Sequence, residues 1–125
     1  MKFTQPFTLR SGVILKNRVL MAPMTISSSQ ANGDVTADEL AYYHRRAKSG
    51  IGAVITACAA INKLASGFTN SIGAESDDRL ESLKRLAQSI QTGGAKAILQ
   101  IYHAGRMSNS KLLGVQPVSA SNIPP

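Results

Sequence analysis

The sequence predicts a parallel α/β fold. Three apolar runs, at residues 18–22, 53–57 and 95–102, have the aliphatic and β-branched character of buried strands. Two amphipathic helical segments separate these runs, so the predicted order is strand, helix, strand, helix, strand. Because the runs are close to continuously apolar, we expect a sheet covered on both faces, as is typical of parallel strands.

Both helical segments have recognisable ends. Thr36-Ala37-Asp38-Glu39 has the spacing of a capping box, and Gly50 follows where a left-handed residue often ends a helix. The second segment begins at Ser76-Asp77-Asp78, whose two acidic side chains the positive end of a helix favours, and ends at Gly93-Gly94. Its predicted apolar face consists of Leu80, Leu83, Leu86, Ala87 and Ile90.

The remaining segments are predicted to lie outside the sheet. We expect a hairpin within residues 1–15, the first β/α units at 16–110, which include a loop at 62–76, and a terminal loop at 111–125. The strand spacing suits either a doubly wound sheet or a (β/α)₈ barrel. Three strands and two helices cannot close a barrel, so the chain is interpreted as the N-terminal piece of a larger α/β protein.

The composition restricts the class of protein. The chain has 125 residues, enough for one domain, and its only cysteine, Cys58, has no partner for an internal disulfide. The net charge is +7, but the cations are dispersed and aromatic residues make up only 5%, so nucleic-acid binding is the least favoured interpretation. The longest apolar stretch, 51–61, is too short to cross a membrane. No apolar signal segment opens the sequence, so we expect a cytoplasmic protein.

Chemistry is expected where the predicted strands end. Ligands of parallel α/β folds bind beyond the carboxyl ends of the strands, which selects residues 22–25, 57–59 and 100–106. Thr25 and Gln100 offer a hydroxyl and an amide that could bind the polar edge of a heterocycle. The side chains of Val19, Met21, Val54 and Thr56 are expected to face the interior of the barrel. The sequence contains no phosphate-binding glycine motif and no paired metal-ligand spacing, so no metal site is predicted.

Three blocks carry a resemblance to a known family. Residues 15–25 (LKNRVLMAPMT) are similar to the N-terminal signature of the old yellow enzyme family, the FMN-dependent NAD(P)H:flavin oxidoreductases. Residues 34–47, with the capping box, Tyr42-Tyr43 and Arg46-Ala47, resemble the same family. Residues 100–106 (QIYHAGR) resemble its Gln-Leu-x-His-x-Gly-Arg motif. The blocks occur in the family's order and cover most of the chain.

This resemblance implies the N-terminal portion of a (β/α)₈ barrel: a hairpin lid, strands one to three and helices one and two. It also implies FMN as the cofactor, NADH or NADPH as the reductant, and an electron-poor alkene or similar small electrophile as the hydride acceptor. The implied FMN contacts are Ala22, Pro23, Met24, Thr25, Cys58 at the end of the second strand, and Gln100. Ser27 stands where another branch of the family often has an aromatic residue at the substrate, so we assign Ser27 to the substrate pocket.

No catalytic residue is assigned, because the family's substrate-binding pair and its tyrosine proton donor lie beyond these 125 residues. The expected partners are the rest of the barrel and a small-molecule acceptor, with a homo-oligomer left open and neither nucleic acid nor a membrane expected. The alternative is a non-catalytic fragment or assembly module that a second chain completes.

Overall fold

The predicted order of strands and helices is confirmed in the computed structural model, which describes residues 1–123. The sheet is built from β3 (Leu20–Met21), β4 (Ala53–Ala60) and β6 (Lys96–Tyr102), and the long helices are α1 (Ala37–Lys48) and α2 (Leu80–Thr92). The shorter elements are η1 (Lys2–Thr4), β1 (Phe7–Thr8), β2 (Ile14–Leu15), η2 (Lys63–Ala65), β5 (Ile72–Gly73), η3 (Asp77–Arg79), η4 (Gly105–Met107) and α3 (Ser110–Leu113).

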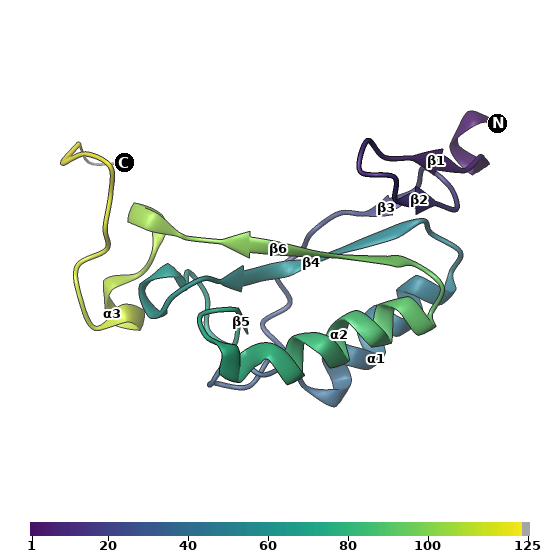
Figure 1. The fold of residues 1–125 in the computed structure, drawn as a ribbon. Helices are drawn as coiled ribbons and strands as arrows, with labels where there is room; N and C mark the ends of the chain where they lie inside the picture. Colours follow the sequence, from purple (N-terminus) through teal and green to yellow (C-terminus); the bar gives the residue numbers. More distant parts are fainter. Residues whose placement is uncertain (124–125) are drawn as a thin grey trace.

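All strand pairs in the main sheet are parallel, as predicted, and β4 is the central strand. Leu20 of β3 pairs with Ala53 of β4, and Ala59 of β4 pairs with Ile72 of β5. Because β6 follows β4 along its length on one edge, β3 and β5 share the other edge. Figure 1 shows β4 and β6 side by side, with their carboxyl ends toward the loops that precede α3.

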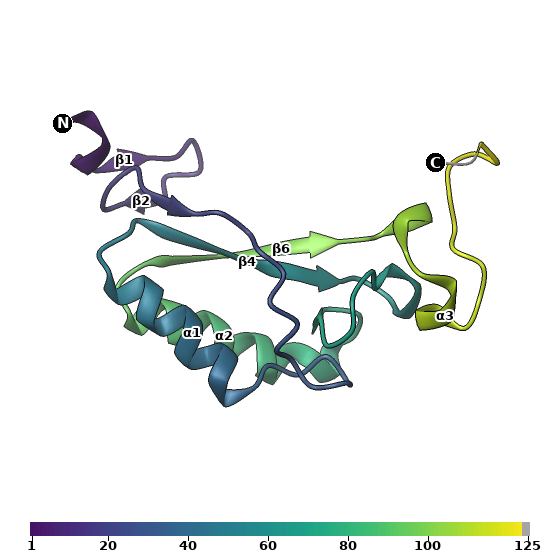
Figure 2. The same cartoon turned by 180° about the vertical axis from the view of Figure 1, so that it is seen from behind.

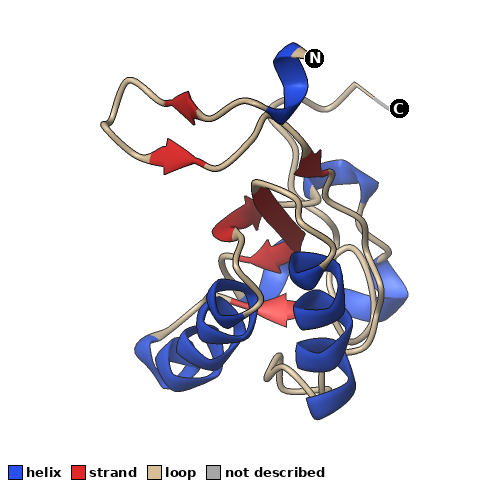
Figure 3. Ribbon diagram, turned by 90° about the vertical axis from the view of Figure 1, so that its right-hand side faces the viewer, coloured by secondary structure: helices blue, strands red, loops and turns tan. Residues whose placement is uncertain are grey.

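Both long helices cover the same face of the sheet (Figures 1, 2 and 3), and among residues 1–123 no long helix lies on the opposite face, which we call the bare face. The core between helices and sheet includes Tyr43, Val54, Leu86 and Ile90, each at most 2% exposed. The predicted apolar face of the second helix packs against this core through Leu83, Leu86 and Ile90, whereas Leu80, in the first turn of α2, is half exposed.

The predicted start of α1 and the predicted stops of both helices are confirmed, whereas α2 begins at Leu80 and the acidic residues Asp77 and Asp78 lie in the preceding η3. The hydroxyl of Thr36 accepts a hydrogen bond from the Glu39 N–H at 3.2 Å, which satisfies one of the free amides in the first turn of α1. Gly50 and Gly94 follow α1 and α2 with φ of +96° and +90°, a conformation that glycine adopts without steric cost. These stops return the chain from each helix to the next strand.

The N-terminal hairpin lies at the amino ends of the strands (Figures 1 and 2), where the lid of a barrel is expected. Its two strands pair antiparallel, with Phe7 opposite Leu15. The guanidinium of Arg18 lies 4.5 Å from the centre of the Phe7 ring, and the Arg18 N–H donates to the carbonyl of Phe3. These contacts join the hairpin to the start of β3.

Four features differ from the sequence-based expectation. β3 is only two residues long, and β4 continues three residues past Ala57. The expected loop at 62–76 contains the short strand β5, in which Ile72 is buried but has no periodic neighbours that would indicate a strand. The expected terminal loop opens with the helical turn α3, while Pro124 and Pro125 lie outside the described residues.

Three of the predicted barrel-facing side chains were assigned to the wrong face. Val54 belongs to the core under the helices, Met21 packs against that core, and Thr56 lies beside the apolar residues of α2. The fourth, Val19, lies just before β3 and is exposed. A continuously apolar strand shows no alternation, so its sequence cannot indicate which face it presents to the helices.

Candidate functional site

Three of the predicted site residues meet on the bare face of the sheet, opposite the helices. Cys58 of β4 and Gln100 of β6 are register partners, so their side chains leave the sheet on the same face. The hydroxyl of Thr25, which follows β3, lies 3.5 Å from the sulfur of Cys58. A hydroxyl, a thiol and an amide from three successive strand regions are thereby brought together.

The position of Cys58 differs from the prediction in one respect. The sequence placed it at or just beyond the end of its strand, whereas β4 continues to Ala60. Cys58 is buried within the strand, and β6 continues for two residues past Gln100, to Tyr102. The three residues therefore form a floor slightly below the carboxyl rim of the sheet.

The segment after β3 supplies the other predicted residues. Ala22, Met24 and Thr25 are exposed and Pro23 is half-buried, so this segment leaves room for a ligand on the bare face. Ser27, the predicted substrate residue, is exposed and has φ of +47°, which is uncommon for a residue with a side chain. Ile26, which follows Thr25, packs against the core under the helices, so the chain leaves the bare face immediately after Thr25.

A buried polar pair holds the end of this segment. The hydroxyl of Ser29 donates to the carboxylate of Glu39 at 2.6 Å, and both residues are at most 4% exposed. Burial raises the pKa of Glu39, although the hydrogen bonds from Ser29 and from the Thr36 backbone oppose that shift. The Ser29 N–H also donates to the carbonyl of Asn70, which ties the segment to the loop before β5.

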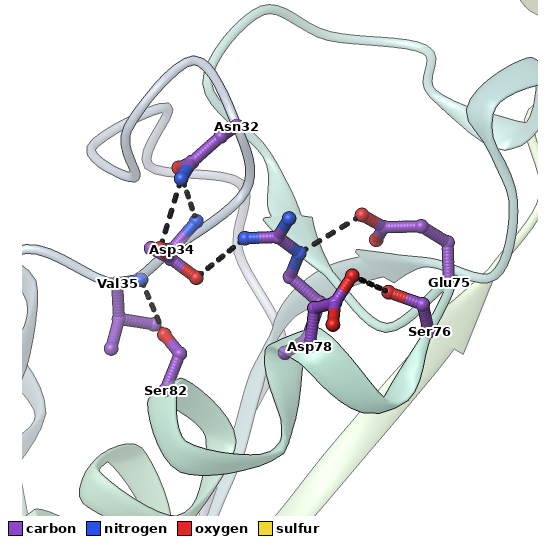
Figure 4. Close-up of polar contacts among 8 residues, drawn as sticks. Asn32, Asp34, Val35, Glu75, Ser76, Asp78 and Ser82 are labelled. Atoms are coloured by element: carbon purple, nitrogen blue, oxygen red, sulfur yellow. Dashed lines mark hydrogen bonds and ion pairs between the residues drawn. The ribbon is translucent and has the colours of Figure 1, made fainter.

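A second polar cluster joins the segment before α1 to the turn that follows β5 (Figure 4). Arg79 contacts Asp34 at 2.7 Å and Glu75 at 3.0 Å, and Asn32 also donates to the Asp34 carboxylate. The Arg79 and Asn32 hydrogen bonds lower the pKa of Asp34. Sequence reasoning missed this cluster, because an ion pair between residues 45 positions apart gives no local signal.

The sequence analysis also did not predict a stacked pair of aromatic side chains, Phe68 and Tyr102. The ring of Tyr102 stacks on Phe68 with their centres 6.3 Å apart and their planes 26° apart. Tyr102 stands two residues after Gln100 and so lies on the same face of β6. The period of two along a strand was the available signal for Tyr102, whereas the position of Phe68 depends on the fold of the loop.

Comparison with known proteins shows which family has this sequence and this fold. The family described as the NADH:flavin oxidoreductase / NADH oxidase family matches residues 2–124, nearly the whole chain. The chain belongs to this family. The resemblance of residues 15–25, 34–47 and 100–106 to the old yellow enzymes is thereby confirmed.

Two relatives and one solved structure illustrate the match. The chain is 45% identical over 123 residues to the NADH:fumarate oxidoreductase of Klebsiella pneumoniae, covering 98% of the chain and 13% of the relative. It is 44% identical over 115 residues to the NADH:acrylate oxidoreductase of Vibrio harveyi, covering 91% and 11%. The structure of the old yellow enzyme homologue from Zymomonas mobilis superposes with a TM-score of 0.88 at 28% identity, covering 97% of the chain and 33% of that structure.

The chain thus corresponds to the N-terminal third of an old yellow enzyme barrel, and it spans only 13% and 11% of the two curated relatives. This coverage explains the bare face: in a (β/α)₈ barrel that face points toward the remaining strands. Within residues 1–123, no helix combines the length and the apolar character needed to cross a bilayer.

Proposed function

We propose that this chain forms the flavin-binding N-terminal part of an FMN-dependent oxidoreductase that uses NADH or NADPH. The observation that carries the proposal is the meeting of Thr25, Cys58 and Gln100 on the bare face of a parallel sheet. That face is where a (β/α)₈ barrel places its ligand, near the carboxyl ends of the strands.

The residues present fit the polar ring system of FMN. Thr25 offers a hydroxyl that can donate to a ring carbonyl, and the half-buried amide of Gln100 can both donate and accept at the pyrimidine edge. Cys58 supplies a small, polarizable surface between them. We assign Ala22, Pro23 and Met24 to the wall beside the ring and Ser27 to the acceptor pocket.

When bound, FMN supplies hydride transfer between the nicotinamide and the acceptor. The residues of this chain bind and orient the ring. The hydroxyl of Thr25 donates a hydrogen bond at the position where negative charge develops on reduction. The relatives named for fumarate and acrylate act on alkenes conjugated to a carboxylate, which supports an electron-poor alkene as the acceptor class. The carbonyl-binding and proton-donating groups are assigned to the rest of the barrel.

The test uses the completed barrel, in which residues 1–125 are joined to the remaining β/α units. We expect it to bind FMN with a flavin absorbance spectrum that bleaches under anaerobic NADH or NADPH. A folded, completed barrel that retains no flavin after reconstitution would overturn the proposal. It would favour the alternative, a non-catalytic assembly module completed by a second chain. A homo-oligomer and a cytoplasmic location remain predictions from the sequence.

A further inference from the structure

The central strand contains an irregularity just before the site. Ile55 pairs with Ile98 and Cys58 pairs with Gln100, so Thr56 and Ala57 of β4 stand opposite the single residue Leu99 of β6. This is a β-bulge, which is rare between parallel strands. Because a bulge adds one residue to one strand only, the side chains that follow it point to the opposite face of the sheet.

The bulge determines the face on which Cys58 lies. Without it, alternation would place Cys58 on the same face as Val54 and Thr56, which is the face under the helices. With the extra residue, Ala57 and Ala59 face the helices, and Cys58 turns to the bare face beside Thr25. Gln100 is the register partner of Cys58, so the bulge also sets which two side chains stand together.

Two side chains satisfy the backbone groups that the bulge releases. The Ala57 N–H donates to the hydroxyl of Tyr43 at 2.7 Å, and Tyr43 comes from α1 with its side chain fully buried. The hydroxyl of Thr56 accepts from the Gln100 N–H at 3.2 Å and donates to the Ala57 carbonyl at 2.9 Å. A buried N–H without a partner is costly, so these bonds favour the bulged register over a regular one.

We propose that Tyr43 and Thr56 are positioning residues for the flavin: they hold the bulge that aims Cys58 and Gln100 at the cofactor. This inference rests on the proposed function. Neither side chain lies on the bare face, so neither is expected to touch the cofactor. Their effect on flavin binding is exerted through the register of β4 and β6.

The test replaces single hydroxyls in the completed barrel. Tyr43→Phe removes the acceptor for Ala57, Thr56→Val removes the acceptor for Gln100, and Thr56→Ser restores it. The matched control is Ser89→Ala, which removes a 2.7 Å hydrogen bond from α2 to the Leu40 carbonyl of α1, away from the bulge. Each variant is first checked for folding by circular dichroism. FMN dissociation constants and backbone hydrogen exchange are then measured.

We expect Tyr43→Phe and Thr56→Val to raise the FMN dissociation constant about tenfold, the effect of losing one well-placed hydrogen bond. Thr56→Ser and Ser89→Ala should bind FMN as the wild type does. In the flavin-free protein, Tyr43→Phe should accelerate exchange at Ala57, and Thr56→Val should accelerate it at Gln100. Folded variants that bind FMN as tightly as Ser89→Ala would overturn the proposal.

The two proposals fail in different ways. If the wild-type barrel binds no flavin, the proposed function is wrong. The part of this inference that places Cys58 and Gln100 against the cofactor is then wrong as well. Exchange at Ala57 and Gln100 would then still decide whether Tyr43 and Thr56 hold the bulge. If the wild type binds FMN and the hydroxyl variants match the control, only the positioning role is wrong.

Discussion

The sulfur of Cys58 lies 3.5 Å from the hydroxyl oxygen of Thr25, although the two residues are 33 positions apart. One residue belongs to the central strand and the other to the segment after its neighbour, so the contact exists only when β3 and β4 pair in parallel. The contact fixes the hydroxyl of Thr25 over the bare face. This makes Thr25 the most direct probe of the proposed flavin site.

Thr25→Val should lower the reduction potential of the bound flavin while FMN binding is largely preserved. A hydroxyl that donates to a ring carbonyl stabilises the negative charge that develops on reduction. Its loss costs ~0.5–1.5 kcal/mol, which is about 10–30 mV for a two-electron couple. The potential is measured by dye-coupled titration of the completed barrel. Thr25→Ser, which keeps the hydroxyl, is the control, and an unchanged potential in Thr25→Val would show that the hydroxyl does not reach the ring.

Glu39→Gln should change how stability depends on pH. Burial raises the pKa of Glu39 above its ordinary value of 4.5, so the folded state holds this proton more tightly than the unfolded state does. The resulting stability is fully present below the unfolded pKa and is lost as the pH rises through the folded pKa. The glutamine variant lacks this loss, so its free energy of unfolding should increase relative to wild type as the pH rises above 4.5.

Urea unfolding of the completed barrel at several pH values measures this difference. The control is Glu81→Gln, because the Glu81 side chain is 80% exposed and pairs with Lys84, one turn further along the helix surface. A difference between the Glu39→Gln variant and wild type that stays constant with pH would contradict the buried-carboxylate interpretation.

Asp34→Asn should loosen the two loops at the carboxyl rim. The Arg79 hydrogen bond is the main cause of the lowered pKa of Asp34, so this carboxylate stabilises the fold above its ordinary pKa of 3.8. That contribution is lost as the pH falls through the lowered folded pKa. At neutral pH the variant should therefore exchange the Gly73 amide faster, because Gly73 donates to Gly33 across the same junction. In strong acid the variant and wild type should converge.

The matched control for this experiment is Asp78→Asn. Asp78 lies beside the cluster in Figure 4, where it accepts a hydrogen bond from Ser76 rather than from Arg79. Faster exchange at Gly73 in both variants would attribute the effect to lost surface charge, and the proposed role of the Asp34–Arg79 pair would be wrong.

Much of the fold was predictable because its signals are local. The capping box at Thr36 and the glycines at 50 and 94 mark helix ends through their own backbone requirements. The parallel sheet followed from apolar runs separated by helices. The strand β5 was not predictable, because two residues give no period and Ile72 is strand-like only through its pairing with Ala59.

The residues of the proposed site were singled out from the sequence, but their geometry was not, and their role as FMN contacts stays a prediction. Thr25, Cys58 and Gln100 were identified from strand ends and from a family resemblance, and the structure brings them together. The faces of Val54 and Thr56 were wrong, and the bulge that turns Cys58 was not foreseen. A bulge changes the parity of every later residue in the strand, and it depends on partners such as Tyr43 that lie elsewhere in the sequence.

Residues 1–125 expressed alone should self-associate. Among the described residues β6 pairs only with β4, so the backbone groups on its other edge are open to another chain. Ile101 of this strand is 71% exposed, and an apolar hollow of about 300 Å³ between β6 and α2 is lined by Leu80, Leu83 and Leu99. In a barrel, further strands and helices cover such surfaces, whereas exposed apolar patches on an isolated chain favour association.

Sedimentation velocity should show species larger than 13.2 kDa, and their proportion should rise with protein concentration. Ile101→Lys places a charge on the open edge strand and should shift the distribution toward monomer. Val118→Lys is the matched control: Val118 is 50% exposed but lies in the terminal loop, so the same charge there should have little effect. A monomer with a sharp cooperative thermal transition would contradict the prediction, since the sheet would then be stable with its edge and face uncovered. That result would favour the stand-alone module over the incomplete barrel.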